Sequence, residues 1–192
     1  MTPQAPAQNN FLSRATDLVN RGFSVIPIEP RGKRPSGPGA TSRTRDLETV
    51  KVWAASWPDA NAAVCADENI TILESDDAAR FRGVLAGLGV TLPETLTGGA
   101  SENRPHWFYK RTAACGDVCL EVPGVFEFRN VNQYVVGPGS IHSSGAEYRF
   151  WKDVPMVALP GRGHRCLAPA GRGIQRGSEK RTHPPRALYG AP

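Results

Sequence analysis

Three helix-forming segments alternate with short apolar segments in the first half of the chain, and only strand-forming segments follow in the second half. The helical segments repeat apolar residues at a spacing of three and four, whereas the second half consists of short strand-like runs separated by Gly, Pro and Asn. Alternation followed by strands alone predicts an α/β or α+β domain made of two sub-parts.

The predicted helix ends follow from capping residues. Asn10 is the predicted N-cap of the helix FLSRATDLVNRG, and Gly22 is its stop. Asp46 is the predicted N-cap of a second helix that ends before Pro58, and Asp77 is that of the third helix. The residues expected to face inward from the third helix are Phe81, Val84, Leu85 and Leu88. The predicted strands are FSVIPI, NAAVCA, ITILESD, PHWFYKR, GVFEFRN, QYVVGP and EYRFW.

The length and composition are those of a soluble globular protein. The 192 residues are enough for one domain with a hydrophobic core, and 40% of them are apolar while 21% are charged. No apolar run approaches the ~20 residues needed to span a bilayer, and the N-terminus lacks the basic and apolar regions of a signal peptide. We therefore expect a cytoplasmic protein whose four irregularly spaced cysteines are reduced.

Three regions are expected along the chain. Residues 1–10 are polar and contain Pro, which predicts a disordered N-terminus, and residues 11–160 contain every periodic segment of the expected domain. Residues 161–192 are rich in Gly, Pro and Arg and lack periodicity, so we expect a basic disordered tail. One hypothesis is that this tail comes from a frameshift or a truncated gene.

The net charge of +5 comes from this tail and not from the folded body. The tail contains seven Lys or Arg and one Glu, a net charge of +6, which leaves 16 basic and 17 acidic side chains in the other 160 residues. The basic pI is therefore no argument that the body binds nucleic acid.

The stretch ITILESDD places three carboxylates within four positions at the end of an apolar strand. Residues i and i+2 of a strand point to the same face, so the carboxylates of Glu74 and Asp76 can reach one ion. Hard cations such as Mg²⁺ take oxygen ligands, which makes this pair a candidate metal site. Asp77 points the other way and caps the following helix. The alternative is that both aspartates are cap residues and Glu74 is a solvated strand end.

Three later stretches add candidate site residues. His106 lies at the start of the strand PHWFYK, and His142 follows a GPGS turn. Glu127 and Arg129 share one face of the strand GVFEFRN, opposite two phenylalanines. A strand that lines a site has such a polar face, but so does any half-exposed strand. A lone histidine such as His142 is more often structural than catalytic.

Two further features have competing interpretations. The loop RGKRPSGPGATSRTR contains five basic residues and is either a functional loop or a solvated surface loop. Cys115 and Cys119 are spaced C-x₃-C with His106 as the only nearby partner. Structural zinc usually needs four well-spaced ligands, so this spacing argues against a zinc site.

The order and spacing of these segments resemble the N-terminal domain of bifunctional DNA primase/polymerases, a branch of the archaeo-eukaryotic primase superfamily. The resemblance covers roughly residues 11–160 and is found in FLSRATDLVNRGFSVIPIEP, GKRP, VWAASWPDANAAV, ITILESDD, LPETLTGG, RPHWFYK, FEFRN and YVVGPGSIHSSGAEY. It implies an archaeo-eukaryotic primase-like fold, in which a strand–helix unit and a sheet like that of the RNA-recognition motif surround a central cleft.

The resemblance also implies four catalytic residues. Glu74 and Asp76 stand where the family has an acidic pair that binds the catalytic metal ions, and Glu127 stands where it has a third acid. The family usually has Asp where this chain has Glu74 and Glu127. His106 matches a histidine expected to contact the phosphates of the incoming nucleotide. The other implied nucleotide contacts are Arg129, Lys33 or Arg34, Ser140 and His142. For Ser140 and His142 a structural role in their turn is an equal alternative.

The implied reaction is template-directed nucleotidyl transfer with Mg²⁺ or Mn²⁺, in the replication of a mobile element or phage. A 3′-hydroxyl attacks the α-phosphorus of a nucleoside triphosphate, while two cations held by three carboxylates activate the hydroxyl and stabilise the leaving pyrophosphate. Basic side chains neutralise the triphosphate, and the loop at residues 31–45 would hold phosphates of a single-stranded DNA template. A helicase domain or protein is a candidate partner, and no membrane is involved.

Two alternatives to an active enzyme stay open. Two Glu residues replace the usual Asp, and the chain has no P-loop motif GxxxxGK[ST]. Both features are compatible with a catalytically weak or inactive module that binds nucleotides or single-stranded DNA. The other alternative is a truncated fragment of a larger primase-helicase.

Overall fold

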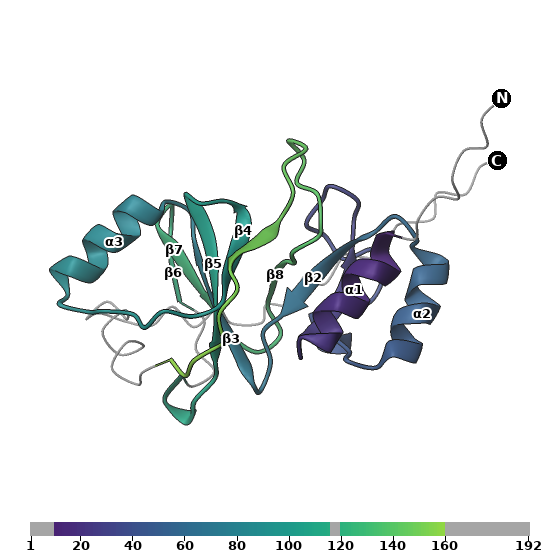
Figure 1. Ribbon diagram of the computed structural model, residues 1–192, viewed down its shortest axis with the longest axis horizontal. Helices are drawn as coiled ribbons and strands as arrows, with labels where there is room; N and C mark the ends of the chain where they lie inside the picture. Colours follow the sequence, from purple (N-terminus) through teal and green to yellow (C-terminus); the bar gives the residue numbers. More distant parts are fainter. Residues whose placement is uncertain (1–9, 116–119, 160–192) are drawn as a thin grey trace, which may run out of the picture.

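The structure is a computed structural model that describes residues 10–115 and 120–159. These residues form an α+β domain of two antiparallel sheets with helices at both ends (Figure 1). The predicted basic tail and, apart from Asn10, the predicted disordered N-terminus lie outside the described residues. The smaller sheet contains, in spatial order, β1 (Ser24–Ile28), β2 (Asn61–Cys65) and β8 (Tyr134–Val136). The larger sheet contains β6 (Leu120–Val122), β7 (Phe126–Arg129), β3 (Ile70–Ser75), β5 (Arg104–Lys110), β4 (Thr97–Ser101) and β9 (Arg149–Lys152).

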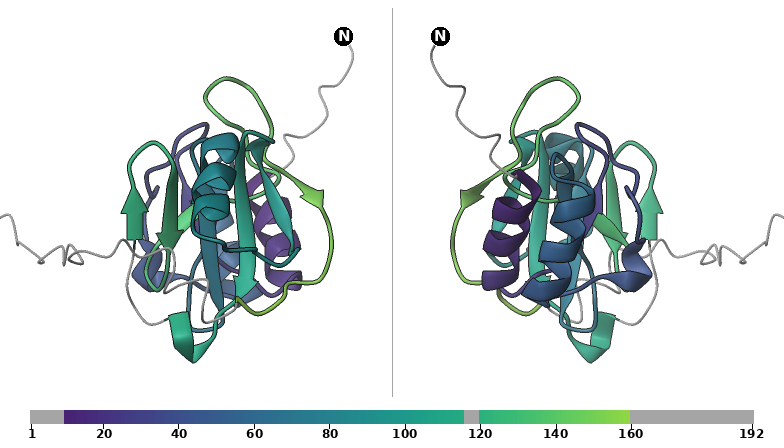
Figure 2. Two further views of the ribbon diagram at one scale, coloured as in Figure 1. Left: turned by 90° about the vertical axis from the view of Figure 1, so that its left-hand side faces the viewer. Right: turned by 90° about the vertical axis from the view of Figure 1, so that its right-hand side faces the viewer.

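Three α-helices flank the sheets: α1 (Asn10–Asn20), α2 (Leu47–Ser56) and α3 (Ala78–Gly87). Figure 2 shows α1 and α2 side by side at one end of the molecule and α3 at the other, where it covers the larger sheet. Short 3₁₀ turns occur at Ala40–Ser42 and Ala113–Cys115. None of the helices in the described part of the chain has the length and apolar character needed to cross a membrane.

The predicted helix caps are confirmed for α2 and α3. The carboxylate of Asp46 accepts hydrogen bonds from the backbone N–H groups two and three residues later, and Asp77 does the same at the start of α3. The helix α1 begins at Asn10 itself. Gly22 follows that helix with a φ of +88°, the left-handed conformation that glycine adopts readily after a helix.

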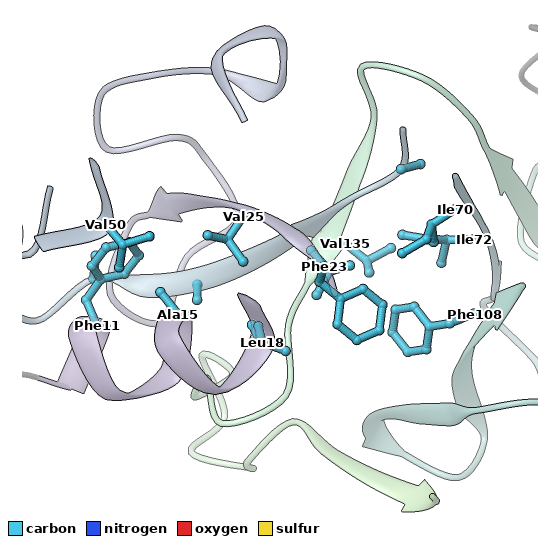
Figure 3. Close-up of a cluster of buried hydrophobic side chains, with 14 of the residues drawn as sticks. Phe11, Ala15, Leu18, Phe23, Val25, Val50, Ile70, Ile72, Phe108 and Val135 are labelled. Atoms are coloured by element: carbon cyan, nitrogen blue, oxygen red, sulfur yellow. The ribbon is translucent and has the colours of Figure 1, made fainter. Parts of the chain in front are cut away.

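The main hydrophobic core joins the two sheets. Side chains of α1 and α2 pack onto one face of the smaller sheet, and the same cluster continues to β3 and β5 of the larger sheet (Figure 3). Phe23 meets Phe108 edge-on, with ring centroids 5.2 Å apart. A second cluster fills the space between α3 and the opposite face of the larger sheet, where Phe81 packs on Phe126. The centre of the larger sheet is therefore buried on both faces.

The central strand β3 contributes side chains to both clusters in alternation. Ile70 and Ile72 belong to the main core, and Leu73 belongs to the cluster beneath α3. Because side chains alternate with a period of two residues in a strand, Glu74 points to the same side as Ile72, toward the smaller sheet. The core-facing residues of β3 thereby decide on which face of the sheet the acidic stretch lies.

The sequence analysis does not predict β4 or β6. The strand β4 has the sequence TGGAS, and its two glycines weaken the strand signal. A Cβ atom at Gly98 would lie 2.6 Å from the carbonyl oxygen of Arg149, and one at Gly99 would lie 2.7 Å from that of Arg104. Glycine is needed at both positions because the neighbouring backbones approach so closely. Strand propensity does not take such close approaches between backbones into account.

Two residues predicted to face inward from α3 are exposed, so that prediction is wrong. Val84 and Leu88 keep 37% and 49% of their surface exposed, whereas Phe81 is fully buried and Leu85 is partly buried against the same cluster. The reason is that α3 contacts the larger sheet along one narrow face. Apolar side chains at the border of that face are left in solvent although their spacing fits the helical period.

We expect Phe108→Ala to lower the free energy of unfolding by about 3–5 kcal/mol, because it removes a buried ring that joins the two sheets and leaves a cavity. Chemical denaturation measures this change. The matched control is Val52→Ala, at a helix side chain with 66% exposure, which should change the stability by less than about 0.5 kcal/mol. Equal effects of the two substitutions would contradict the role of Phe108 between the sheets.

Candidate functional site

The pairing of β3 with its two neighbours brings polar side chains together at the centre of the larger sheet. In the strand register Glu74 lies opposite His106 of β5 on one side and opposite Glu127 of β7 on the other. Arg129 follows two residues later on the same face of β7. The predicted residues Glu74, His106, Glu127 and Arg129 are thus neighbours, on the face of the sheet directed toward the smaller sheet.

An arginine links the two glutamates of this group. The carboxylate of Glu74 accepts a hydrogen bond from Arg129 Nε at 2.7 Å and forms an ion pair with Arg129 Nη2 at 2.6 Å. The same Nη2 also forms an ion pair with Glu127. The guanidinium therefore lies between two carboxylates, where its charge offsets the cost of holding both of them partly buried.

The surroundings shift the acidity of the two glutamates in opposite directions. Burial alone would raise the pKa of Glu74, but hydrogen bonds and charges from His106 and Arg129 outweigh it and lower the pKa to about 2. Burial raises the pKa of Glu127, and the guanidinium of Arg129 offsets only part of this rise. The negative charges of Glu74, Glu121 and Asp76 raise the Glu127 pKa further, which places Asp76 close to the group.

His106 is a buried histidine with an unused polar atom. Its residue is 4% exposed, and Nε2 lies 3.5 Å from Oε1 of Glu74. Nδ1 is shielded from solvent and has no hydrogen-bond partner in the described part of the chain. A buried nitrogen without a partner costs free energy that a bound ligand can recover by supplying a hydrogen bond.

The loop between β8 and β9 contains the predicted residues Ser140 and His142. The buried hydroxyl of Ser140 donates to the carbonyl oxygen of Ala62 and accepts from its N–H group, both at 3.0 Å, so it fastens the loop to β2. His142 is partly exposed and its Nδ1 accepts a hydrogen bond from the backbone N–H of Ser144. The structure thus gives Ser140 the structural role that the sequence left open, whereas His142 remains partly accessible.

The basic side chains of the loop at residues 31–45 are either paired with carboxylates or exposed. Arg43 and Arg45 form ion pairs with Glu68 and the buried Asp67 respectively. Arg31, Lys33 and Arg34 are exposed and have no ion-pair partner within the described ranges. Within the described ranges, residues 31–34 are therefore the part of the loop whose basic side chains are exposed without an acidic partner.

The exposed part of the loop is attached next to the site. The hydroxyl of Tyr134 on β8 donates to the carbonyl oxygen of Lys33 at 2.9 Å. Burial raises the pKa of this tyrosine, and the charge of Arg129 is near enough to offset part of the rise. The hydrogen bond therefore places Lys33 on the side of the site where Arg129 lies.

Tyr148 and Arg104 also lie in this region, although neither is among the site residues predicted from the sequence. Tyr148 is 5% exposed, and its ring stacks on that of His106. Burial and the charge of Glu74 raise the pKa of Tyr148, while Arg104 lowers it, so both residues lie near its phenol. Arg104 is exposed and stands two residues before His106 on the same face of β5. The spacing Arg-x-His in a strand is a signal that could have revealed Arg104, whereas no local pattern marks Tyr148.

The carboxylates fit a divalent cation in chemistry but not in their present arrangement. Carboxylate oxygens are the ligands that Mg²⁺ and Mn²⁺ prefer. Among the described residues, however, no three His, Cys, Asp or Glu side chains are placed to hold one ion. Instead, Glu74 and Glu127 both form ion pairs with Arg129. A cation at these carboxylates would compete with the guanidinium for their oxygens, and the three-carboxylate metal site stays a prediction.

The two cysteines within the described ranges are buried free thiols, Cys65 and Cys115. Cys119, the other member of the C-x₃-C spacing, lies outside them. The expectation of no zinc site at this spacing is therefore not tested by the structure.

The described residues thus form an α+β domain that gathers acidic side chains, a buried histidine and an arginine on one face of a sheet. The comparison with protein families identifies the family of this chain. The chain belongs to the family of bifunctional DNA primase/polymerases, whose N-terminal domain model matches residues 15–162. The predicted resemblance and fold class are thereby confirmed. None of the curated proteins compared with the chain matches it.

We expect Glu74→Gln to lower the free energy of unfolding by about 2 kcal/mol at pH 7 in a metal-free buffer. The folded-state pKa of about 2 lies below the 4.5 of an unperturbed glutamate side chain. The carboxylate therefore stabilises the fold above pH 4.5, and this contribution is lost as the pH falls toward 2. Urea denaturation at pH 7 and pH 3 should show the difference between variant and wild type shrinking at the lower pH. The exposed Glu102→Gln serves as control, and a difference that grows on acidification would contradict the assignment.

Proposed function

We propose that this domain catalyses metal-dependent, template-directed nucleotidyl transfer. The observation that supports this proposal is the placement of Glu74, His106 and Glu127 side by side on three neighbouring strands, with Arg129 between the two glutamates. Family membership supports the same class of reaction, since the family comprises DNA primase/polymerases. The substrates would be nucleoside triphosphates and single-stranded DNA.

The proposed reaction joins a 3′-hydroxyl to the α-phosphorus of a nucleoside triphosphate and releases pyrophosphate. Arg129 has a planar fork of N–H groups that suits the oxygens of a phosphate. The buried Nδ1 of His106, which has no hydrogen-bond partner among the described residues, supplies a second contact. Catalysis of this kind depends mainly on positioning and electrostatic stabilisation of the phosphoryl group. The exposed Arg104 adds positive charge at the same face of β5.

The proposed ligands of the metal ion are Glu74, Asp76 and Glu127. A bound Mg²⁺ or Mn²⁺ would supply neutralisation of the charge that develops on the phosphate oxygens. The guanidinium of Arg129 forms ion pairs with two of these carboxylates. We infer that Arg129 exchanges its carboxylate partners for the triphosphate, because both sets of oxygens attract the same donor groups.

The exposed residues Arg31, Lys33 and Arg34 are the proposed contact for template phosphates. Tyr134 holds their loop beside the site through the carbonyl oxygen of Lys33, and Lys and Arg side chains are the usual partners of the nucleic-acid backbone. Replication of a mobile element or phage, a cytoplasmic location and a helicase as partner remain expectations that rest on the resemblance alone.

One observation favours a second candidate function. Glu74 and Glu127 are already paired with Arg129, and no metal-binding group of three side chains occurs within residues 10–115 and 120–159. A domain that kept this arrangement would bind nucleotides or single-stranded DNA without catalysis. The two glutamates at positions where the family usually has Asp point in the same direction.

Labelled-nucleotide incorporation on single-stranded DNA, with and without a primer, tests the proposal directly. We expect incorporation by the wild type with Mg²⁺ or Mn²⁺ and a loss of at least about 100-fold in Glu74→Ala/Asp76→Ala, because the transition-state charge is no longer neutralised. The exposed Glu102→Ala is the matched control and should retain activity. DNA binding by the wild type without any incorporation would exclude the enzyme and leave the binding module.

We expect Arg129→Gln to bind Mn²⁺ about 10-fold more tightly than the wild type in the absence of nucleotide, because a positive charge next to the carboxylates is removed. The same variant should bind nucleoside triphosphate more weakly, since it loses the guanidinium fork. Calorimetry with Mn²⁺ alone and with nucleotide alone measures the two effects separately. The control is Arg149→Gln, at an exposed position of β9. Weaker Mn²⁺ binding by Arg129→Gln would show that the arginine does not compete with the cation.

A further inference from the structure

The His106 ring has one polar contact and two aromatic contacts. The polar contact with Glu74 Oε1 is long, at 3.5 Å, and Nδ1 has no partner among the described residues. Two aromatic rings also lie against the imidazole. Tyr148 stacks on it with ring centroids 5.9 Å apart and planes at 28°, and Phe108 meets it edge-on at 6.4 Å. Stacked and edge-on arrangements are the favourable geometries for such rings.

Phe108 and Tyr148 reach His106 from different parts of the fold. Phe108 lies on β5, the same strand as the histidine, so it moves with that strand. Tyr148 comes from the end of the loop that joins β8 to β9. Its backbone N–H donates to the carbonyl oxygen of Ser140 at 2.8 Å, and its carbonyl oxygen accepts from the N–H of Gly139 at 2.7 Å. Tyr148 is therefore held by the loop.

This loop is fastened to the smaller sheet. Asn61, the first residue of β2, donates through its side chain to the carbonyl oxygen of Ile141 at 2.8 Å and accepts from the N–H of Ile141 at 3.0 Å. The two hydrogen bonds between Ser140 and Ala62 lie next to this pair. Tyr148 thus connects an anchor on the smaller sheet with a histidine on the larger sheet, across the space that the site occupies.

We propose that Tyr148 is a positioning residue whose ring holds the imidazole of His106 in the orientation in which Nδ1 is available to a nucleotide phosphate. The proposal rests on the proposed function, because it requires a phosphate ligand at His106. The ring of Tyr148, and not its hydroxyl group, has this role. Leucine at this position keeps an apolar side chain but removes the ring, so that the imidazole loses its stacking partner.

The test is a double-mutant cycle on nucleotide affinity. Deoxynucleoside triphosphate binding is measured by calorimetry in the presence of Mn²⁺ for the wild type, Tyr148→Phe, Tyr148→Leu, His106→Ala and the double variant Tyr148→Leu/His106→Ala. We expect Tyr148→Phe to bind within about 2-fold of the wild type and Tyr148→Leu about 10-fold more weakly. Because Tyr148 acts through His106, the leucine substitution should have no further effect in the His106→Ala background.

Two results would overturn the proposal. One is additivity of the two substitutions, which would mean that Tyr148 acts independently of His106. The other is an equal loss in Tyr148→Phe and Tyr148→Leu, which would assign the effect to the hydroxyl group. If the wild type does not bind nucleotide at all, the proposed function fails, and the proposal fails with it.

A ligand-free measurement tests the stack itself, and its wild-type result does not depend on whether Tyr148→Leu folds. The ring protons of His106 in the wild type should resonate at higher field than those of the partly exposed His142, whose ring lies at 57° to Tyr148 instead of stacking on it. Loss of the shift in a folded Tyr148→Leu, and its retention in Tyr148→Phe, would support the proposal. Absence of any ring-current shift at His106 in the wild type would overturn it even if nucleotide binds normally.

Discussion

The fold depends on β3, a strand that is buried on both faces and has a charged residue, Glu74, at its second-last position. One face of β3 packs against the core that joins the two sheets, and the other packs beneath α3. Glu74 continues the face of Ile70 and Ile72, so a carboxylate lies at the border of a hydrophobic core. A charge in this position is tolerated only if neighbouring groups compensate it. Arg129 and His106, supplied by the two adjacent strands, provide that compensation.

The same compensation connects stability with the proposed chemistry. The arginine that stabilises Glu74 in the ligand-free protein also has the geometry to bind a phosphate, and the carboxylates that it pairs with have the chemistry to bind a cation. A bound nucleotide would therefore pair with Arg129, and a bound cation with the carboxylates. Together the two ligands would replace the ion pairs that these side chains form with each other in the ligand-free protein. The buried nitrogen of His106 remains outside this exchange, because no group in the described part of the chain forms a hydrogen bond with it. Its orientation is set by the stack with Tyr148, which connects the two sheets.

The sequence predicts those features that depend on local chemistry. Asp46 and Asp77 were identifiable as caps because an acidic side chain before a helix satisfies free N–H groups of the first turn. The shared face of Glu127 and Arg129 follows from the two-residue period of a strand. The strand β4 is not predicted from the sequence, because glycine has a low strand propensity. Its glycines are required by the close approach of neighbouring backbones, which the sequence does not reveal. The exposure of Leu88 is not predicted from the sequence. The helical period gives the direction of each side chain, but it does not tell how wide the contact between the helix and the sheet is.

By itself, the sequence determined the family, the order of the main elements and the candidate residues Glu74, His106, Glu127 and Arg129, because these depend on residue type and spacing along the chain. Only the tertiary structure decided that these residues are neighbours on one sheet face, since strand register is set by packing between distant segments. It also decided that Ser140 fastens a loop, that Arg43 and Arg45 are tied in ion pairs, and that Tyr148 stacks on His106. Each of these depends on contacts across many residues of chain, which no local pattern records.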